Sequence, residues 1–275
     1  MASRAFGLVL KALGTKKYPN VLKWFWQKLY NLMSRFWSND DWSFLNYGYL
    51  PEVQSEQFVL DEEDEPYRPF LGLYFQAVDG LNISGKRVLE IGCGRGGGIA
   101  YIAKYYSPES VIGLDYSKET IKKAESYYPS TDVLSYQWGD AENLPYPDNH
   151  FDYVINIESS HCYPNMEKFV QEAARVLKGE GILTWADIRG KGDLNATDKH
   201  FASEADLSLE YENSLSKGVL RALDAMNEMK MQRIKRIPLI RKFFAEFAGM
   251  KDSKIYNWLE SGNVVYIARR YQKNN

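Results

Sequence analysis

The chain has 275 residues, enough for one large domain or two small ones with a sizeable core. It is 45% hydrophobic and 25% charged, which is ordinary for a soluble globular protein. A net charge of −2 gives no argument for a nucleic-acid partner, and two cysteines exclude a disulfide framework. No apolar run approaches the roughly 20 residues of a membrane-spanning helix. We therefore expect a cytoplasmic protein.

Residues 1–60 are predicted to form a helical arm or lid. Within it, Val21–Trp37 repeats apolar residues at helical spacing, and the first 37 residues hold seven bases and no acid. Two interpretations stay open. The helix packs on the main domain, or it lies on a membrane with anionic lipid headgroups or covers a hydrophobic substrate.

From residue 86 onward, strand and helix patterns alternate, after a predicted helix over Arg68–Asp79. The predicted strands are Arg87–Ile91, Ser110–Leu114, Val133–Trp138, Tyr153–Ile157 and Gly181–Ile188. The predicted helices are Gly97–Tyr106, Lys118–Tyr127 and Lys168–Leu177. Apolar strands alternating with helices predict a doubly wound α/β fold, whose mostly parallel sheet is covered on both faces. Ligands of such sheets bind beyond the carboxyl ends of the strands.

Residues 191–250 interrupt this alternation. They are rich in Met, Leu and Phe, and Val219–Met231 is helical in pattern. We expect a helical cap here, inserted before a closing strand over Val264–Tyr271 and covering the active site. The predicted organisation is therefore the 1–60 arm followed by one domain, 61–275, that contains this cap.

The end of the first strand is the most informative stretch. Five glycines follow Glu90 within eight residues, which predicts a tight turn where a ligand approaches bare backbone. Gly92, Gly94 and Gly97 fit the dinucleotide fingerprint. Gly92, Gly94 and Gly96 equally fit the Gly-x-Gly-x-Gly of S-adenosylmethionine (SAM) methyltransferases. The spacing alone does not decide between the two.

Two acids favour SAM over a dinucleotide, and a third fits both. The Glu90 carboxylate would repel a pyrophosphate but attract the α-amino group of a methionine moiety. Asp115 ends the second strand and suits a ribose hydroxyl pair, as either template requires. Asp140 follows the third strand in a segment that resembles the methyltransferase signature contacting adenine. The expected cofactor-binding residues are Tyr47, Glu90, Gly92, Cys93, Gly94, Gly96, Asp115, Tyr116, Gly139, Asp140, Ala141 and Asn156.

His161 follows the fourth strand and is expected to lie near the sulfonium. A neutral imidazole is suited to remove the proton of an acceptor hydroxyl, so we predict a general base, with a structural or substrate-binding histidine as the alternative. Glu158 is expected to orient this imidazole or to contact the cofactor. Asp187 and Arg189 are predicted to bind substrate, or else to lie on the surface. No cluster has metal-ligand spacing, so no metal is expected.

Several strings are shared with one family. They are Asp64-Glu65-Pro66 with Arg68, Gly96–Gly98, Gly113–Asp115, Gly139–Pro145, Glu158–Pro164, Ala186–Arg189 and Tyr256–Gly262. On these the chain resembles the class I methyltransferases, and within them the phthiotriol/phenolphthiotriol dimycocerosate methyltransferase family. The resemblance covers about residues 40–190 and, more loosely, 243–272. It implies a seven-stranded Rossmann-like sheet and O-methylation of a secondary hydroxyl on a long polyketide-derived lipid.

Small-molecule methyltransferases often carry a tyrosine-containing segment before the domain. By that resemblance Tyr47 is expected to close over the cofactor and Tyr49 to contact substrate, with core packing as the alternative for both. We expect a SAM-dependent O-methyltransferase that acts on a hydroxyl of a hydrophobic lipid or polyketide-like molecule and releases S-adenosylhomocysteine (SAH). A C-methyltransferase, a non-methylating cyclase that retains the cofactor, and a non-enzymatic binding protein stay open as alternatives. The sequence indicates no oligomeric state.

Overall fold

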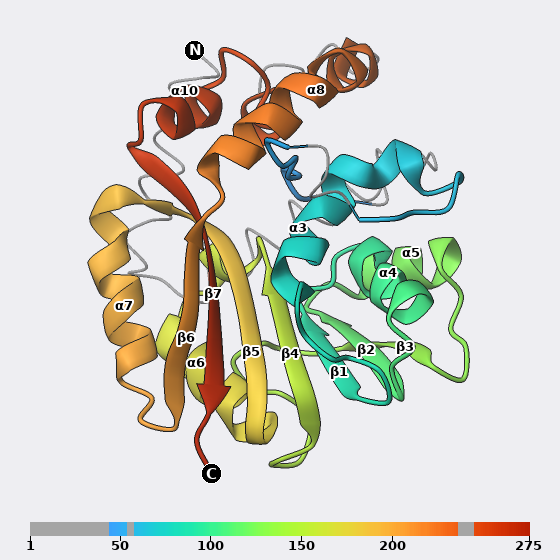
Figure 1. The fold of residues 1–275 in the computed structure, drawn as a ribbon, viewed down its shortest axis with the longest axis vertical. Helices are drawn as coiled ribbons and strands as arrows, with labels where there is room; N and C mark the ends of the chain where they lie inside the picture. Colours follow the sequence, from blue (N-terminus) through green and yellow to red (C-terminus); the bar gives the residue numbers. More distant parts are fainter. Residues whose placement is uncertain (1–43, 54–57, 236–244) are drawn as a thin grey trace.

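A seven-stranded sheet with helices on both faces forms the body of the protein (Figure 1). Its strands run in the order β3-β2-β1-β4-β5-β7-β6. Strands β1 to β5 are parallel, whereas β7 is antiparallel to both of its neighbours. The strands are β1 (Arg87–Ile91), β2 (Ser110–Asp115), β3 (Leu134–Trp138), β4 (Phe151–Ile157), β5 (Leu177–Gly190), β6 (Leu207–Ser214) and β7 (Val264–Lys273). This confirms the predicted doubly wound, mostly parallel fold.

The computed structural model describes residues 44–53, 58–235 and 245–275. The predicted helix Val21–Trp37 and its basic surroundings lie outside these ranges. Within them, no helix is both long enough and apolar enough to cross a membrane.

Helices follow the strands as predicted, with small shifts at their ends. They are α3 (Arg68–Val78), α4 (Gly97–Tyr105), α5 (Lys118–Tyr127), α6 (Met166–Val176), α7 (Leu194–Ala202), α8 (Ser216–Lys235) and α10 (Lys254–Glu260). Helix α6 begins two residues before the predicted Lys168, because the Asn165 side chain accepts a hydrogen bond from the Lys168 N–H at 3.0 Å and caps the helix. Strand β5 begins at Leu177, four residues before the predicted start.

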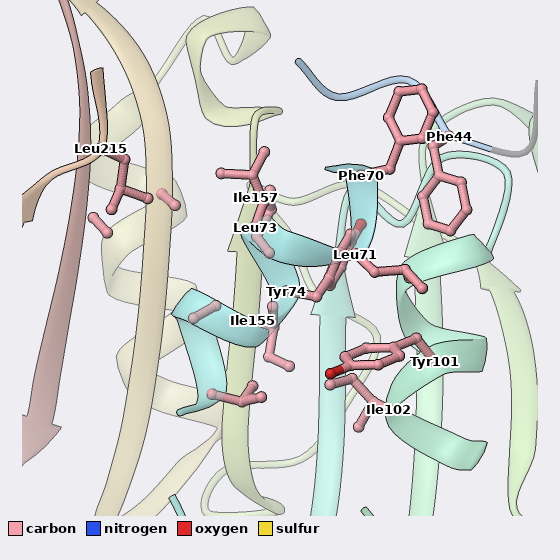
Figure 2. Close-up of a cluster of buried hydrophobic side chains, with 14 of the residues drawn as sticks. Phe44, Phe70, Leu71, Leu73, Tyr74, Tyr101, Ile102, Ile155, Ile157 and Leu215 are labelled. Atoms are coloured by element: carbon pink, nitrogen blue, oxygen red, sulfur yellow. The ribbon is translucent and has the colours of Figure 1, made fainter. Parts of the chain in front are cut away.

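The two faces of the sheet hold separate apolar cores. Along β1, Val88 packs into the core under α3 and α4, while Leu89 packs into the core under α6, because successive strand residues point to opposite faces. Figure 2 shows the first core, where Tyr74 of α3 and Tyr101 of α4 lie near Ile155 of β4. Glu90 points to the same face of the sheet as Val88, so its carboxylate meets Tyr74 in the first core.

The cap differs from the prediction in one element. Helices α7 and α8 are present, and α8 contains the predicted Val219–Met231. Between them, however, β6 pairs antiparallel with β7 and forms the edge of the sheet. The segment 191–250 was predicted to be helical throughout, so β6 is a correction to that prediction.

The order of the strands determines where the site lies. From β1 the sheet extends to one side through β2 and β3, and to the other side through β4 and β5. Loops leaving adjacent strand ends diverge at such a point and open a crevice. The segment before α3 lies across this end: the Tyr49 N–H donates to the Pro69 carbonyl at 2.7 Å, and the Leu50 N–H donates to the Gly218 carbonyl of α8 at 3.0 Å. Helices α8 and α10 lie above the same end of the sheet (Figure 1).

Candidate active site

The glycine turn after β1 leaves the backbone bare and leads directly into α4. Gly92 has φ +78°, and a Cβ atom there would lie 2.5 Å from the Ser159 Oγ atom. Gly94 has φ +53°, and a Cβ there would meet only a Leu45 methyl, at 3.8 Å. Only glycine combines this backbone conformation with so close an approach. The turn therefore forms an open cradle for a ligand, as predicted.

A cavity that is partly open to solvent lies over this turn. Eight of the expected cofactor-binding residues line it, namely Gly92, Cys93, Gly94, Asp115, Tyr116, Gly139, Asp140 and Ala141. The structure thus brings the ends of β1, β2 and β3 together around one ligand site. Tyr47, Glu90, Gly96 and Asn156 are not part of the cavity wall.

The charge of the cavity wall distinguishes the two nucleotide templates. Among the residues that the structure describes, four carboxylates and one guanidinium, that of Arg95, line the cavity. The four are Asp115, Asp140, Glu142 and Glu158. Such a surface repels a pyrophosphate and attracts a cation. The residues present therefore fit SAM, which combines a nucleoside with a sulfonium and an ammonium group.

Asp115 is held in place for a ribose by the turn itself. Its Oδ2 accepts the Gly94 N–H at 3.1 Å, and its Oδ1 accepts the Ser117 N–H at 2.8 Å. Burial raises the pKa of Asp115 to about 6, although these two hydrogen bonds oppose the rise. The carboxylate has capacity left to accept from ribose hydroxyls.

Glu90 differs from our expectation that it faces the ligand. Its side chain is fully buried, and its Oε1 accepts the Tyr74 hydroxyl at 2.7 Å. Tyr74 itself lines the cavity. Burial raises the pKa of Glu90 to about 8, with the Tyr74 hydrogen bond opposing and Asp115 adding to the rise. Glu90 thus supports the cavity wall from behind.

Asn156 also lies behind the wall. Its Nδ2 donates to the Ile91 carbonyl at 2.8 Å and contacts the Ser159 and Tyr163 hydroxyls at 2.8 and 3.1 Å. Ser159 and Tyr163 line the cavity, although neither was predicted to belong to the site. Asn156 therefore fixes two polar side chains where they meet the glycine turn.

The segment after β4 pairs His161 with Asp187 of β5. The His161 Nδ1 lies 2.7 Å from the Asp187 Oδ1, and the His161 backbone N–H donates to Oδ2 at 2.9 Å. The imidazole is 27% exposed, while the carboxylate is fully buried. His161 itself lines neither the cofactor cavity nor the smaller cavity beside it, although its neighbour Cys162 lines the former. Since a carboxylate accepts, this contact assigns the Nδ1–H tautomer and directs Nε2 away from Asp187.

Asp187 is surrounded by donors. Its Oδ2 accepts the Ser160 hydroxyl at 2.6 Å and faces the Arg189 guanidinium at 2.9 Å. The Ser160 hydroxyl in turn accepts from Arg189 at 2.7 Å and from the Trp185 indole at 2.8 Å. Neither Asp187 nor Arg189 lines the cavity. They were predicted to bind substrate, but the structure places them behind His161, where a buried ion pair holds the imidazole.

The electrostatics of this pair favour its ionised form. Burial raises the pKa of Asp187, but Arg189 and His161 outweigh burial and hold it well below its usual range. Burial lowers the pKa of His161, but Cys162 and Asp187 outweigh it and raise that pKa well above its usual value. The imidazole is thus a stronger base than a free histidine.

Comparisons with known proteins agree with this site. A methyltransferase-domain family model matches residues 89–185. The chain is also 33% identical, over 96% of its length and 96% of the relative, to a phthiotriol/phenolphthiotriol dimycocerosates methyltransferase of Mycobacterium tuberculosis. The chain belongs to this methyltransferase family. It is a SAM-dependent methyltransferase, and SAM is its cofactor.

Two further similarities bear on the methyltransferase. A fatty-acid O-methyltransferase of Mycolicibacterium smegmatis is 37% identical over 72% of each chain. Among solved structures, the cyclopropane synthase MmaA2 of Mycobacterium tuberculosis superposes with a TM-score of 0.65 at 16% identity, covering 84% of this chain and 92% of that one. The latter shows the shared fold.

Glu158 of the methyltransferase does not orient His161 by a hydrogen bond. Its Oε2 accepts the Tyr47 N–H at 2.8 Å and the Tyr266 hydroxyl at 3.0 Å. Glu158 lines the cavity and has φ +50°, an uncommon backbone conformation for this residue type. Of the two predicted alternatives, its position agrees with cofactor contact, and Asp187 takes the orienting position.

The two tyrosines of the segment before α3 are both anchored. The Tyr47 hydroxyl donates to the Phe247 carbonyl at 3.1 Å, so this residue links Glu158 to the cap. The Tyr49 ring packs on Gly218 of α8, where a Cβ would lie 2.1 Å away. Tyr49 lines neither the cofactor cavity nor the smaller cavity beside it. Tyr47 and Tyr49 thus have different surroundings: Tyr47 contacts Glu158 and lines the smaller cavity, whereas Tyr49 packs on α8.

Proposed function

We propose that this methyltransferase transfers the methyl group of SAM to a hydroxyl of a hydrophobic lipid or polyketide-like molecule, with His161 as general base. The single observation that carries the proposal is the 2.7 Å contact between the His161 Nδ1 and the Asp187 Oδ1. Relatives named for lipid acceptors support the acceptor class.

Bound SAM supplies a methyl group that is already activated by the sulfonium. The chain must therefore align the acceptor and take its proton as the new C–O bond forms and the S–CH₃ bond breaks. The His161 Nε2 accepts that proton. The ionised Asp187 stabilises the resulting imidazolium and keeps the ring in one orientation, as in other carboxylate–histidine pairs.

A hydrophobic acceptor agrees with a second, smaller cavity beside the cofactor cavity. It is lined mainly by apolar and aromatic side chains of the segment before α3, of α3 and of the cap. These are Phe44, Leu45, Tyr47, Phe70, Phe247 and Ala248, with the polar Asn46 and Lys230. Three of them, Phe44, Leu45 and Asn46, also line the cofactor cavity. An apolar group could therefore lie beside the cofactor without entering water.

Product analysis tests this proposal. The purified enzyme is incubated with ¹³C-methyl-labelled SAM and two acceptors, a long-chain secondary alcohol and a long-chain fatty acid. We expect an ether methyl signal from the alcohol and release of SAH. A labelled methyl on carbon would instead indicate a C-methyltransferase. Turnover of the fatty acid alone would contradict the need for a base, because a carboxylate is already ionised at neutral pH.

A further inference from the structure

Glu158 has a feature that the transfer step does not use. Its carboxylate is on the wall of the cofactor cavity, yet no basic side chain is hydrogen-bonded to it among the described residues. Both of its hydrogen bonds, from the Tyr47 N–H and the Tyr266 hydroxyl, go to Oε2. These two donors hold the carboxylate in position, and both of them are uncharged.

We propose that Glu158 is the residue by which the enzyme distinguishes SAM from SAH. Ionised Glu158 stabilises the bound sulfonium, and Glu158 becomes protonated when that charge disappears with methyl transfer. SAM and SAH differ only at the sulfur atom, by the methyl group and the positive charge that comes with it. A carboxylate on the cavity wall whose hydrogen-bond donors are both uncharged is suited to sense the difference.

The protonation state of Glu158 supports this role. Burial raises its pKa to about 7, against the Tyr47 hydrogen bond, the His161 charge and the Tyr266 hydroxyl, while Asp187 adds to the rise. Tyr74 also lies close enough to interact with it electrostatically. Near neutral pH the empty site thus holds Glu158 partly protonated. A bound cation lowers that pKa, so SAM binding releases a proton to solvent.

The proton balance closes over one turnover. Methylation of a hydroxyl by SAM yields SAH, the ether and one proton. His161 accepts that proton, and Glu158 regains the one that it released to solvent when SAM bound, so one proton is released net per turnover. With Glu158 neutral, the site loses its added affinity for a cation, so bound SAH lacks a stabilisation that bound SAM has. The proton balance rests on the proposed hydroxyl acceptor, whereas the difference in affinity between SAM and SAH rests on the cofactor alone.

Two pH-dependent affinities test the inference without any acceptor. The probes are SAH and sinefungin, which carries an ammonium group where SAM carries the sulfonium. We expect sinefungin affinity to rise about fivefold or more from pH 6 to pH 8, as Glu158 ionises, while SAH affinity changes less than twofold. Both ligands share the amino acid and the ribose, so effects of Glu90 and Asp115 are expected to cancel in the ratio.

Variants assign the effect to Glu158. Glu158→Gln should bind SAH as the wild type does, which also shows that it is folded, and should lose the pH dependence of sinefungin binding. Tyr266→Phe removes a hydrogen bond to the carboxylate, so it should move the midpoint to higher pH. Asp132→Asn, at an exposed position before β3 and outside the cavity wall, is the control and should leave the ratio unchanged.

Two results would overturn the inference. One is a parallel rise in affinity for both ligands, because the sulfonium charge would then not be sensed. The other is a pH dependence that survives in Glu158→Gln but disappears in His161→Asn, because the imidazole would then be the group that responds to the cation.

Discussion

Asp187, behind His161, is fully buried, and Glu158, on the wall of the cofactor cavity, is half-buried. Both acids lie near the ends of adjacent strands. Their surroundings differ in one respect. Asp187 faces the Arg189 guanidinium at 2.9 Å and keeps a lowered pKa. Glu158 is hydrogen-bonded to uncharged donors, and burial raises its pKa to about 7.

The same contrast extends to the two regions around them. Near the cofactor, burial also raises the pKa of Glu90 to about 8 and that of Asp115 to about 6. The proposed catalytic region, formed by His161, Asp187 and Arg189, thus contains its own guanidinium, which keeps Asp187 ionised. In the cofactor region, no basic side chain of the described residues is hydrogen-bonded to Glu90, Asp115 or Glu158. We therefore expect its affinity for a cationic ligand to depend on pH, and single substitutions separate the two arrangements.

The largest effect is expected in the catalytic region. His161→Ala should lower turnover by about 100-fold or more, the scale of lost general-base catalysis, and leave SAM affinity nearly unchanged. Steady-state kinetics and calorimetry measure the two quantities. His200→Ala, on α7, is the matched control and should retain turnover. Full activity of His161→Ala would remove this histidine from the base role.

The second prediction for the same region concerns the contribution of Arg189 to the free energy of unfolding. Arg189→Met removes the guanidinium that faces the buried Asp187 charge, which should cost about 3 kcal/mol in the free energy of unfolding measured with urea at pH 7. The loss should shrink toward acid pH, because protonation of Asp187 removes the unpaired charge from the variant. Lys104→Met breaks exposed ion pairs with Asp61 and Glu63 and should cost less than about 1 kcal/mol. Equal losses in the two variants would show that burial does not matter here.

A smaller effect is expected in the cofactor region. Asp115→Ala should weaken SAM binding by about tenfold to hundredfold, the range for losing hydrogen bonds to a charged group. The exposed Asp132, which precedes β3, gives the control Asp132→Ala, which should bind SAM normally. Unchanged affinity in Asp115→Ala would mean that the ribose lies elsewhere.

The cofactor region could be predicted because its signals are local in sequence. The glycine turn and the acids that end β2 and follow β3 each lie within a few residues of a recognisable strand end. Glu90 was placed on the correct strand, but its contact with Tyr74 depends on how α3 packs on the sheet. That packing is a tertiary property, so the sequence pattern alone does not contain it.

The catalytic region depends on contacts between distant residues. His161 and Asp187 were both singled out, but their pairing spans 26 positions and requires β4 and β5 to be neighbours in register. Glu158 meets Tyr47 and Tyr266 across more than 100 positions. Strand β6 was missed for a different reason. Its alternation of Leu207, Leu209 and Tyr211 with polar residues was present in the sequence, inside a segment otherwise helical in pattern.

The pH dependence of kcat/KM, measured for the wild type and for Asp187→Asn, tests the central claim most directly. A base must be neutral to act, so wild-type activity should fall as the pH drops through a pKa above 6.5, where His161 becomes protonated. Asp187→Asn removes one of the charges that raise this pKa, so the fall should move to lower pH, with a reduced maximum. A fall of kcat/KM at the same pH in both proteins, or a wild-type profile that does not change with pH, would contradict the account in which His161, paired with Asp187, is the catalytic base.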